Sequence, residues 1–171
     1  MNTSYFPPFA ILKEGLRISD DGSAVTMSRD LFNKLIASAV RSEFDPVWYR
    51  RENPDIAATV AAGNPIDELA HFAEAGYEEG RRGAYWEVDE AWYLETNRDV
   101  AEAVEAGDFM DGEAHFNETG YFEGRAGDAD MEVEIEMWFN VILSSQKLRG
   151  AKERAGAESR EPSLNAANAI P

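Results

Sequence analysis

The chain has 171 residues with 33 acidic and 16 basic side chains, which gives a formal net charge of −17. Because binding to phosphates or anionic lipids needs clustered Lys and Arg, this excess of carboxylates argues against a nucleic-acid or membrane-surface protein. The chain has no cysteine, so disulfides, thiolate nucleophiles and Cys-type zinc sites are excluded. A hydrophobic content of 44% is that of an ordinary globular protein, and most of the chain is expected to fold.

The N-terminal flank predicts a β-hairpin followed by a helix. Residues 9–19 alternate roughly between apolar and polar, Asp20-Asp21-Gly22 is a turn signal, and residues 23–27 suit a second strand. Ser28 then precedes apolar residues that share one helical face, which predicts a helix from Arg29 to about Ser42. No run of 18 apolar residues is present, so a cytoplasmic protein without a transmembrane segment is expected.

The centre of the chain is a tandem duplication. Residues 45–81 align without a gap onto residues 89–125, at a constant offset of 44, and 19 of the 37 aligned positions are identical. A period of this length indicates a helical repeat whose units stack and share an interface. The identical positions include Asp45/Asp89, Trp48/Trp92, Tyr49/Tyr93, Asp55/Asp99, Gly63/Gly107, His71/His115, Phe72/Phe116, Gly76/Gly120, Tyr77/Tyr121, Glu79/Glu123 and Arg81/Arg125.

Start and stop signals divide each unit into three short helices. Asp45, followed by proline, can cap a first helix that ends near Asn53. A second helix is predicted over residues 55–62 with Gly63 as a left-handed cap, and a third runs to about Ala75 and stops at Gly76. The repeated apolar positions predict the core, which in the first unit comprises Trp48, Tyr49, Ile56, Val60, Ala70, Phe72 and Tyr77.

After a linker at residues 127–130, a C-terminal helix is predicted from Met131 to about Lys152. Its acidic start and basic end suit the helix dipole. The segment Met137–Leu143 is apolar on nearly all sides, which is typical of a buried helix. It could pack across the repeats as a cap, or form a dimer or partner interface anchored by Trp138 and Phe139. From about Ala155 the composition predicts a disordered tail.

The repeat unit resembles a short helical repeat of bacterial proteins. The motif is Phe44-Asp45, Trp48-Tyr49, Asn53-Pro54-Asp55-Ile56-Ala57, His71-Phe72 and Gly76-Tyr77-Glu78-Glu79-Gly80-Arg81, and it covers roughly residues 44–125. The second unit departs from it by having Arg98 in place of proline. Such repeats occur beside or inside glycosyltransferases and other proteins of surface-polysaccharide synthesis. The resemblance implies an accessory or interaction module, and it carries no catalytic residues over to this chain.

The repeated polar residues have both a structural and a chemical interpretation. His71 and His115 could be metal ligands or general bases, but each is alone in its unit, which favours a bond to a turn or helix end. The pairs Asp45/Asp89 and Asp55/Asp99 could serve glycoside hydrolysis, although helix capping explains both pairs with fewer assumptions. For Glu79/Glu123 and Arg81/Arg125, a salt bridge between units is favoured over an anion site. The acidic turns 20–22 and 107–113 lack the ligand pattern of a calcium loop.

The aromatic residues also divide into those with a structural interpretation and those that could make contacts. Trp48 and Trp92 recur in register, which favours the core over a sugar-stacking groove. Tyr85 and Trp86 lie in the linker without an identical counterpart, so they are the better candidates for exposed contact. The predicted partner-binding residues are therefore Tyr85, Trp86, Trp138 and Phe139, and the predicted repeat core contains Trp48, Tyr49, His71, Phe72, Trp92, Tyr93, His115 and Phe116.

Taken together, the sequence predicts a mainly α protein: a tandem pair of 44-residue helical repeats with an N-terminal β-hairpin plus helix and a C-terminal helix. We expect a non-catalytic interaction or scaffold protein, with a glycosyltransferase or pathway regulator as its partner, possible homo-oligomers, and no cofactor or metal. The alternative is a carbohydrate-binding module that uses exposed aromatics. The predicted segments are 1–43 (hairpin and helix), 44–84 (first repeat), 85–127 (second repeat), 128–154 (C-terminal helix) and 155–171 (disordered tail).

Overall fold

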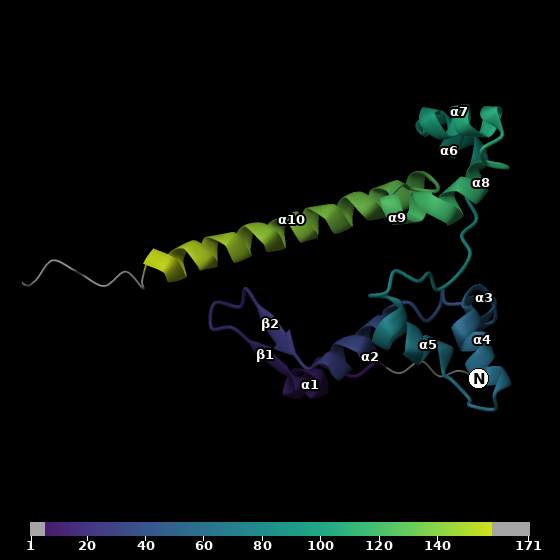
Figure 1. Cartoon of the computed structure of the whole chain (residues 1–171). Helices are drawn as coiled ribbons and strands as arrows, with labels where there is room; N and C mark the ends of the chain where they lie inside the picture. The colour runs from purple at the N-terminus through teal and green to yellow at the C-terminus, as the bar shows by residue number, and fades with distance from the viewer. Residues whose placement is uncertain (1–5, 159–171) are drawn as a thin grey trace, which may run out of the picture. The chain divides into compact units, whose positions relative to one another are not determined.

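The protein is mainly α, with one two-stranded hairpin near its N-terminus (Figure 1). The computed structural model describes residues 6–158, with side chains as far as Lys152. The chain divides into two compact units, Met1–Gly127 and Asp128–Pro171, and each is described by itself.

The first unit begins with a helical turn and the predicted hairpin. Strands β1 (Leu16–Ile18) and β2 (Val25–Met27) pair antiparallel, with Leu16 opposite Met27. The Asp21 carboxylate closes the turn by accepting from the hydroxyls of Ser19, at 2.7 Å, and Ser23, at 2.8 Å. The strand predicted from residue 9 begins only at Leu16. Before it lie α1 (Phe9–Leu12) and η1 (Lys13–Gly15), because the Pro8 carbonyl accepts from two following amides and starts a helical turn.

Helix α2 (Arg29–Ala39) has the predicted N-cap, since the Ser28 side chain accepts from the Leu31 amide at 3.2 Å. It packs against α5 (Glu68–His71) and η2 (Phe72–Gly76) of the first repeat, and it buries Ala37. The helix ends earlier than predicted, because the chain turns at Val40, whose carbonyl accepts from the amides of Glu43 and Phe44.

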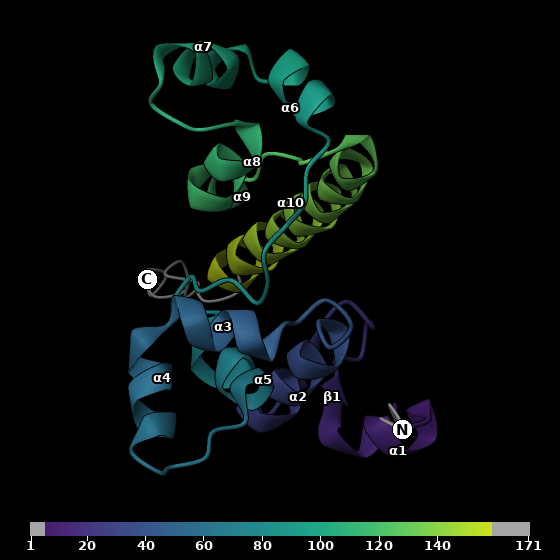
Figure 2. The same cartoon turned by 90° about the vertical axis from the view of Figure 1, so that its right-hand side faces the viewer.

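The two repeats share a succession of three short α-helices and a π-helix, and the second repeat adds α9 (Figure 2). Asp45 and Asp89 are N-caps as predicted: Asp45 accepts from two amides at 2.9 Å and Asp89 from the Trp92 amide at 3.0 Å. The first repeat contains α3 (Pro46–Glu52), α4 (Pro54–Ala61), α5 and η2, and the second contains α6 (Glu90–Thr96), α7 (Arg98–Ala106), α8 (Gly112–His115), η3 (Phe116–Gly120) and α9 (Tyr121–Glu123).

The glycines of the repeats do two different things. Gly63 and Gly107 end their helices in the left-handed region, both at φ 83°, as predicted. The third helical segment of the first repeat begins at Glu68, later than the predicted start at Asn64-Pro65, because Asp67 caps it. It ends at Gly76 as predicted, since η2 covers Phe72–Gly76. The prediction that Gly120 ends the corresponding helix is wrong, because α9 follows η3 directly. The chain then turns at Gly80 and Gly124, whose positive φ angles of 73° and 74° allow the Schellman pattern of C-terminal hydrogen bonds.

Each repeat also closes on itself through its backbone. The Asp45 amide donates to the Gly83 carbonyl at 3.0 Å, and the Asp89 amide donates to the Gly127 carbonyl at the same distance. Since these residues stand at the start and the end of each repeat, the bond ties entry to exit. A hydrogen bond between its first and last residues therefore closes each repeat.

The core consists of residues that recur between the repeats. Tyr49, Tyr93 and Phe116 have an exposed fraction of 0%, and Trp48 and Phe72 are also buried. Trp92 and His71 are half-buried. The prediction that Tyr77 belongs to the core is wrong: 51% of it is exposed, as is 37% of Tyr121. Both tyrosines come directly after the π-helix, beyond the turn that holds the buried phenylalanine. The Tyr77 ring lies 5.9 Å from the ring of the buried Phe72, measured between centroids.

The second unit, in its described residues, is one helix, α10 (Ala129–Glu158). The Asp128 carboxylate accepts from the Met131 amide at 2.7 Å and so begins the helix. The helix continues past the predicted end near Lys152 into the predicted tail, where Ala155 and Ala157 are strong helix formers. The rest of that predicted tail, residues 159–171, lies outside the described residues. Across the described chain, no helix is long and apolar enough to cross a membrane.

Candidate functional site

In each repeat a buried tyrosine and a histidine are hydrogen-bonded to each other. The Tyr93 hydroxyl lies 3.0 Å from His115 Nδ1, and the Tyr49 hydroxyl lies 3.0 Å from His71 Nδ1. Burial raises the pKa of Tyr93 to about 12 and also raises that of Tyr49. The histidines were expected to bond a turn or helix end. The structure instead gives them a side-chain partner, which fixes the position of the tyrosine ring in the core.

A glycine makes room for this pair. A Cβ added at Gly120 would overlap the Tyr93 hydroxyl, and one added at Gly76 would overlap the Tyr49 hydroxyl. The repeated glycine is therefore explained by the close approach of a side chain and requires no special backbone conformation.

An arginine joins three acceptors at the surface of each repeat. In the second repeat Arg125 donates to Asn97 Oδ1 at 2.9 Å, to both oxygens of Asp99 at 2.9 and 2.7 Å, and to Glu123 at 2.6 Å. The first repeat has the same arrangement, in which Arg81 donates to Asn53, Asp55 and Glu79.

This network corrects two predictions. Asp55 and Asp99 do not cap helices, because their carboxylates receive the two-pronged guanidinium of Arg81 and Arg125. That hydrogen bond lowers the pKa of Asp99 to about 2 and lowers that of Asp55. The Glu–Arg ion pairs were predicted to join the two units. They lie within each unit instead, because the glutamate, the glycine and the arginine share one tight turn.

The polar residues that could carry chemistry are thus engaged with one another. The imidazole Nδ1 atoms face tyrosine hydroxyls, and the repeated aspartates Asp55 and Asp99 are paired with arginine. Within residues 6–158 no group of three or more His, Cys, Asp or Glu is placed to hold a metal ion. In the described part, every buried side-chain nitrogen or oxygen has a hydrogen-bond partner.

The linker between the repeats docks on the second repeat through Asn117. Its side chain accepts from the Trp86 amide at 3.0 Å, and it donates to the carbonyls of Trp86, at 2.8 Å, and Glu113, at 2.9 Å. Arg82 also donates to Asn117 and places its guanidinium 4.9 Å from the centre of the Trp48 ring, so it contacts both repeats. Asn117 is not a repeated residue, and the sequence gives no signal for its role beyond that difference.

Tyr85 and Trp86, predicted as contact residues, both lie at this junction. Tyr85 is 46% exposed, and its hydroxyl donates to Glu113 at 2.9 Å. Trp86 is only half-buried and stacks on Tyr121, with 6.3 Å between ring centroids and 17° between planes. Phe122, 55% exposed, contacts Tyr121 edge-on at 5.3 Å. We call Trp86, Tyr121 and Phe122 the junction aromatics.

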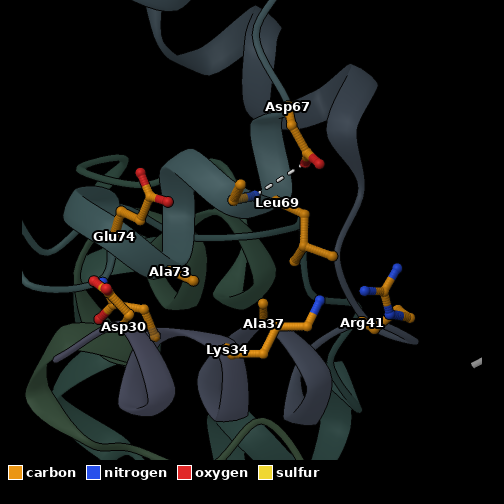
Figure 3. Close-up of a pocket in the computed structure, with 10 residues that line it drawn as sticks. Asp30, Lys34, Ala37, Arg41, Asp67, Leu69, Ala73 and Glu74 are labelled. Carbon is orange, nitrogen blue, oxygen red and sulfur yellow. Dashed lines mark hydrogen bonds between the residues drawn. The ribbon is translucent and has the colours of Figure 1, made fainter. Parts of the chain in front are cut away.

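A shallow pocket lies between α2 and the α5–η2 segment of the first repeat (Figure 3). It has a volume of about 180 Å³ and a lining of mixed character, in which Lys34 and Arg41 stand among carboxylates and small apolar side chains. The carboxylate of Asp67, at the edge of the pocket, already accepts a hydrogen bond from the Ala70 amide at 3.0 Å and so caps α5. Side chains of both charges share this lining, and no cluster of one charge marks it as an anion or cation site.

The other predicted contact residues lie on α10. Trp138 is 63% exposed and Phe139 is 53% exposed. Most of the neighbouring apolar side chains are also exposed: Val133, Met137, Val141, Ile142, Leu143 and Leu148. A continuous set of apolar side chains of this size is typical of an interaction surface.

The shared role of the arginine, asparagine and aspartate in this network is not predicted by the sequence analysis above. Asn53/Asn97, Asp55/Asp99 and Arg81/Arg125 all recur at the offset of 44, and this joint recurrence of polar residues is the signal that could have grouped them.

In the comparisons with known proteins, no family model, no curated protein and no solved structure matches the chain.

Proposed function

We propose that this chain is a non-catalytic cytoplasmic interaction protein that acts by protein–protein contact and is accessory to bacterial surface-polysaccharide synthesis. The observation that carries the proposal is a contrast between two parts of the chain. The repeated polar side chains named above are bonded to one another, whereas Trp138 and Phe139 stand exposed on α10. Aromatic side chains of this kind dominate the free energy of protein association.

The polysaccharide context comes from the motif of the repeats, which resembles that of repeats found with glycosyltransferases. The structure gives those motif residues architectural roles: capping, the Tyr–His pair and the arginine network. These roles support a module whose repeated residues serve its own structure.

The test is retention of partners from the native host by the tagged full chain, including detergent-solubilised membranes, read by mass spectrometry. We expect the wild type to retain enzymes of polysaccharide synthesis and the variant Trp138→Ala/Phe139→Ala to lose them. Met110→Ala, which removes an apolar side chain that is 85% exposed outside α10, is the matched control. Equal retention by the double variant, with unchanged helical circular dichroism and unchanged mass in solution, would show that α10 is not the contact surface.

A second candidate function, carbohydrate binding, is favoured by the junction aromatics. Stacked and exposed rings are the side chains on which sugar rings pack, and Trp86 provides an intrinsic fluorophore at this place. Titration with oligosaccharides should then shift tryptophan fluorescence in the wild type and should not shift it in Trp86→Phe/Tyr121→Ala. An unchanged wild-type spectrum at millimolar oligosaccharide would exclude this function.

A further inference from the structure

Charge is ordered along α10. Within residues 129–152 of α10 the carboxylates come first and the cations last, with the apolar segment between them, and beyond this range Glu153, Arg154 and Glu158 carry both signs. Glu136 and Lys147 are 11 residues apart, so the two groups are beyond the three- or four-residue spacing at which helical side chains pair. At a rise of about 1.5 Å per residue, Glu134 and Arg149 lie about 22 Å apart, well beyond a Debye length of about 8 Å. The carboxylates are Asp130, Glu132, Glu134 and Glu136, and the cations are Lys147, Arg149 and Lys152.

The apolar segment between these charges lacks a partner element within its own unit. The described residues of that unit form α10 alone, and its side chains are exposed: 63% at Trp138 and 60% at Val141, for example. Apolar residues on all sides of a helix are stable in water only when other helices cover them.

We propose that α10 pairs with the α10 of a second copy of this chain, in antiparallel orientation about a two-fold axis near Val141. This inference rests on the proposed function, since it names the partner of the same surface. With that axis, residues 130–136 of one copy lie beside residues 146–152 of the other. Each carboxylate group then faces a cation group, and the apolar segments meet at the centre.

The charge order selects this orientation. A parallel pair would place the carboxylates of one copy beside the same carboxylates of the other, and cations beside cations, which disfavours association. A two-fold axis makes the surface self-complementary, as a dimer interface of identical chains requires. Burial of the apolar segment drives association, and the charges set its direction. Because the segment is apolar on all sides, two such pairs can associate further as four antiparallel helices.

The orientation can be tested by disulfide cross-linking of the full chain, which has no cysteine of its own. Residues seven positions from Val141 lie on the same face of α10 as Val141, so in the antiparallel pair Glu134→Cys of one copy lies beside Leu148→Cys of the other. Two Glu134→Cys residues would be about 21 Å apart, beyond the reach of about 7 Å between disulfide-linked Cα atoms. Under oxidation the mixture of both variants should give a cross-linked product on a non-reducing gel, and each variant alone should give little. A strong cross-link from Glu134→Cys alone would overturn the antiparallel pair.

Mass in solution tests self-association itself. By light scattering at tens of micromolar, the wild type should have twice or four times the chain mass. The variant Glu132→Lys/Glu134→Lys/Glu136→Lys should dissociate at least tenfold more readily, as should Lys147→Glu/Arg149→Glu/Lys152→Glu. Mixing the two should restore association in a 1:1 ratio. Glu102→Lys/Glu105→Lys/Glu118→Lys, three exposed sites in the second repeat, makes the same charge change as the first variant and should keep the wild-type mass.

A monomeric wild type, or a lysine variant that associates like the wild type, would overturn the proposal. The partner retention described above separates this failure from failure of the proposed function. A monomeric chain that still retains polysaccharide-synthesis enzymes through Trp138 and Phe139 would keep the interaction role and reject the second copy as its occupant.

Discussion

Tyr93, His115 and Gly120 depend on one another in the second repeat. The hydroxyl of Tyr93 reaches His115 Nδ1 only because Gly120 has no side chain in the way. His115 is 6% exposed, so without the hydroxyl its ring nitrogen would face the core without a partner. In the first repeat the corresponding His71 is half-buried, and water can replace a lost bond there more easily.

Replacing the tyrosine by phenylalanine separates the two sites. We expect Tyr93→Phe to lower the free energy of unfolding by about 1–3 kcal/mol, the cost of leaving a buried polar group unsatisfied. Tyr49→Phe should cost less, because His71 is nearer to solvent. Urea unfolding followed by circular dichroism measures both, with the exposed Tyr77→Phe as control. Equal losses at the two sites would mean that burial of the histidine does not set the value of this bond.

Much at this scale could be predicted from the sequence. The caps at Asp45 and Asp89 follow from local chemistry, and the burial of Tyr49, Tyr93 and Phe116 follows from apolar recurrence. The roles of Asp55 and Asp99 could not be predicted, because the arginine that binds each of them is 26 residues further along the chain. Local capping and a distant ion pair both place an aspartate near a helix start, and only the folded chain separates them.

The π-helices η2 and η3 are where the prediction of elements failed. Each spans five residues, too short for apolar spacing to separate a π-helix from an α-helix. The wider turn is visible in the backbone, where the Tyr77 amide bonds to the Phe72 carbonyl, five residues back, at 2.7 Å. Glycine at the end of this turn looked like a helix stop, although its role is to admit a tyrosine hydroxyl.

Gly120→Ala tests this role of the π-helix. Alanine favours helix, so at an ordinary helical position the change would stabilise the fold. Here the added Cβ overlaps the Tyr93 hydroxyl, and we expect the free energy of unfolding to fall by about 1–3 kcal/mol, as in overpacked cores. Tyr93→Phe/Gly120→Ala should recover part of the loss, because the overlapping oxygen is gone. The exposed Glu118→Ala on the same π-helix is the control, and a stabilised Gly120→Ala would refute the close contact.

Across the whole of the first unit, the repeats share their internal contacts and differ where their neighbours differ. At the same position of the π-helix the first repeat has Ala73, which is buried where α2 packs, and the second has Asn117, which binds the linker. The small apolar Ala73 thus packs under helix α2, and the side-chain amide of Asn117 hydrogen-bonds to backbone groups of the linker. This difference could not be predicted, because it depends on what covers each repeat and not on the repeat itself.

The linker contact at Asn117 should therefore couple the unfolding of the two repeats. The predicted stacking of the repeats is not observed, because no described helix of the first repeat packs extensively against one of the second, and the linker carries the contact between them. In repeat proteins, stability is the sum of each repeat and its interface, so loss of that contact lets them unfold separately. Asn117→Ala leaves the Trp86 amide and carbonyl without their partner, and we expect a loss of about 1–3 kcal/mol together with two resolved unfolding transitions. Urea unfolding combined with hydrogen exchange would place the first transition in residues 89–125, while Glu118→Ala should unfold like the wild type. A single transition in Asn117→Ala with the wild-type midpoint would show that Asn117 does not connect the repeats energetically.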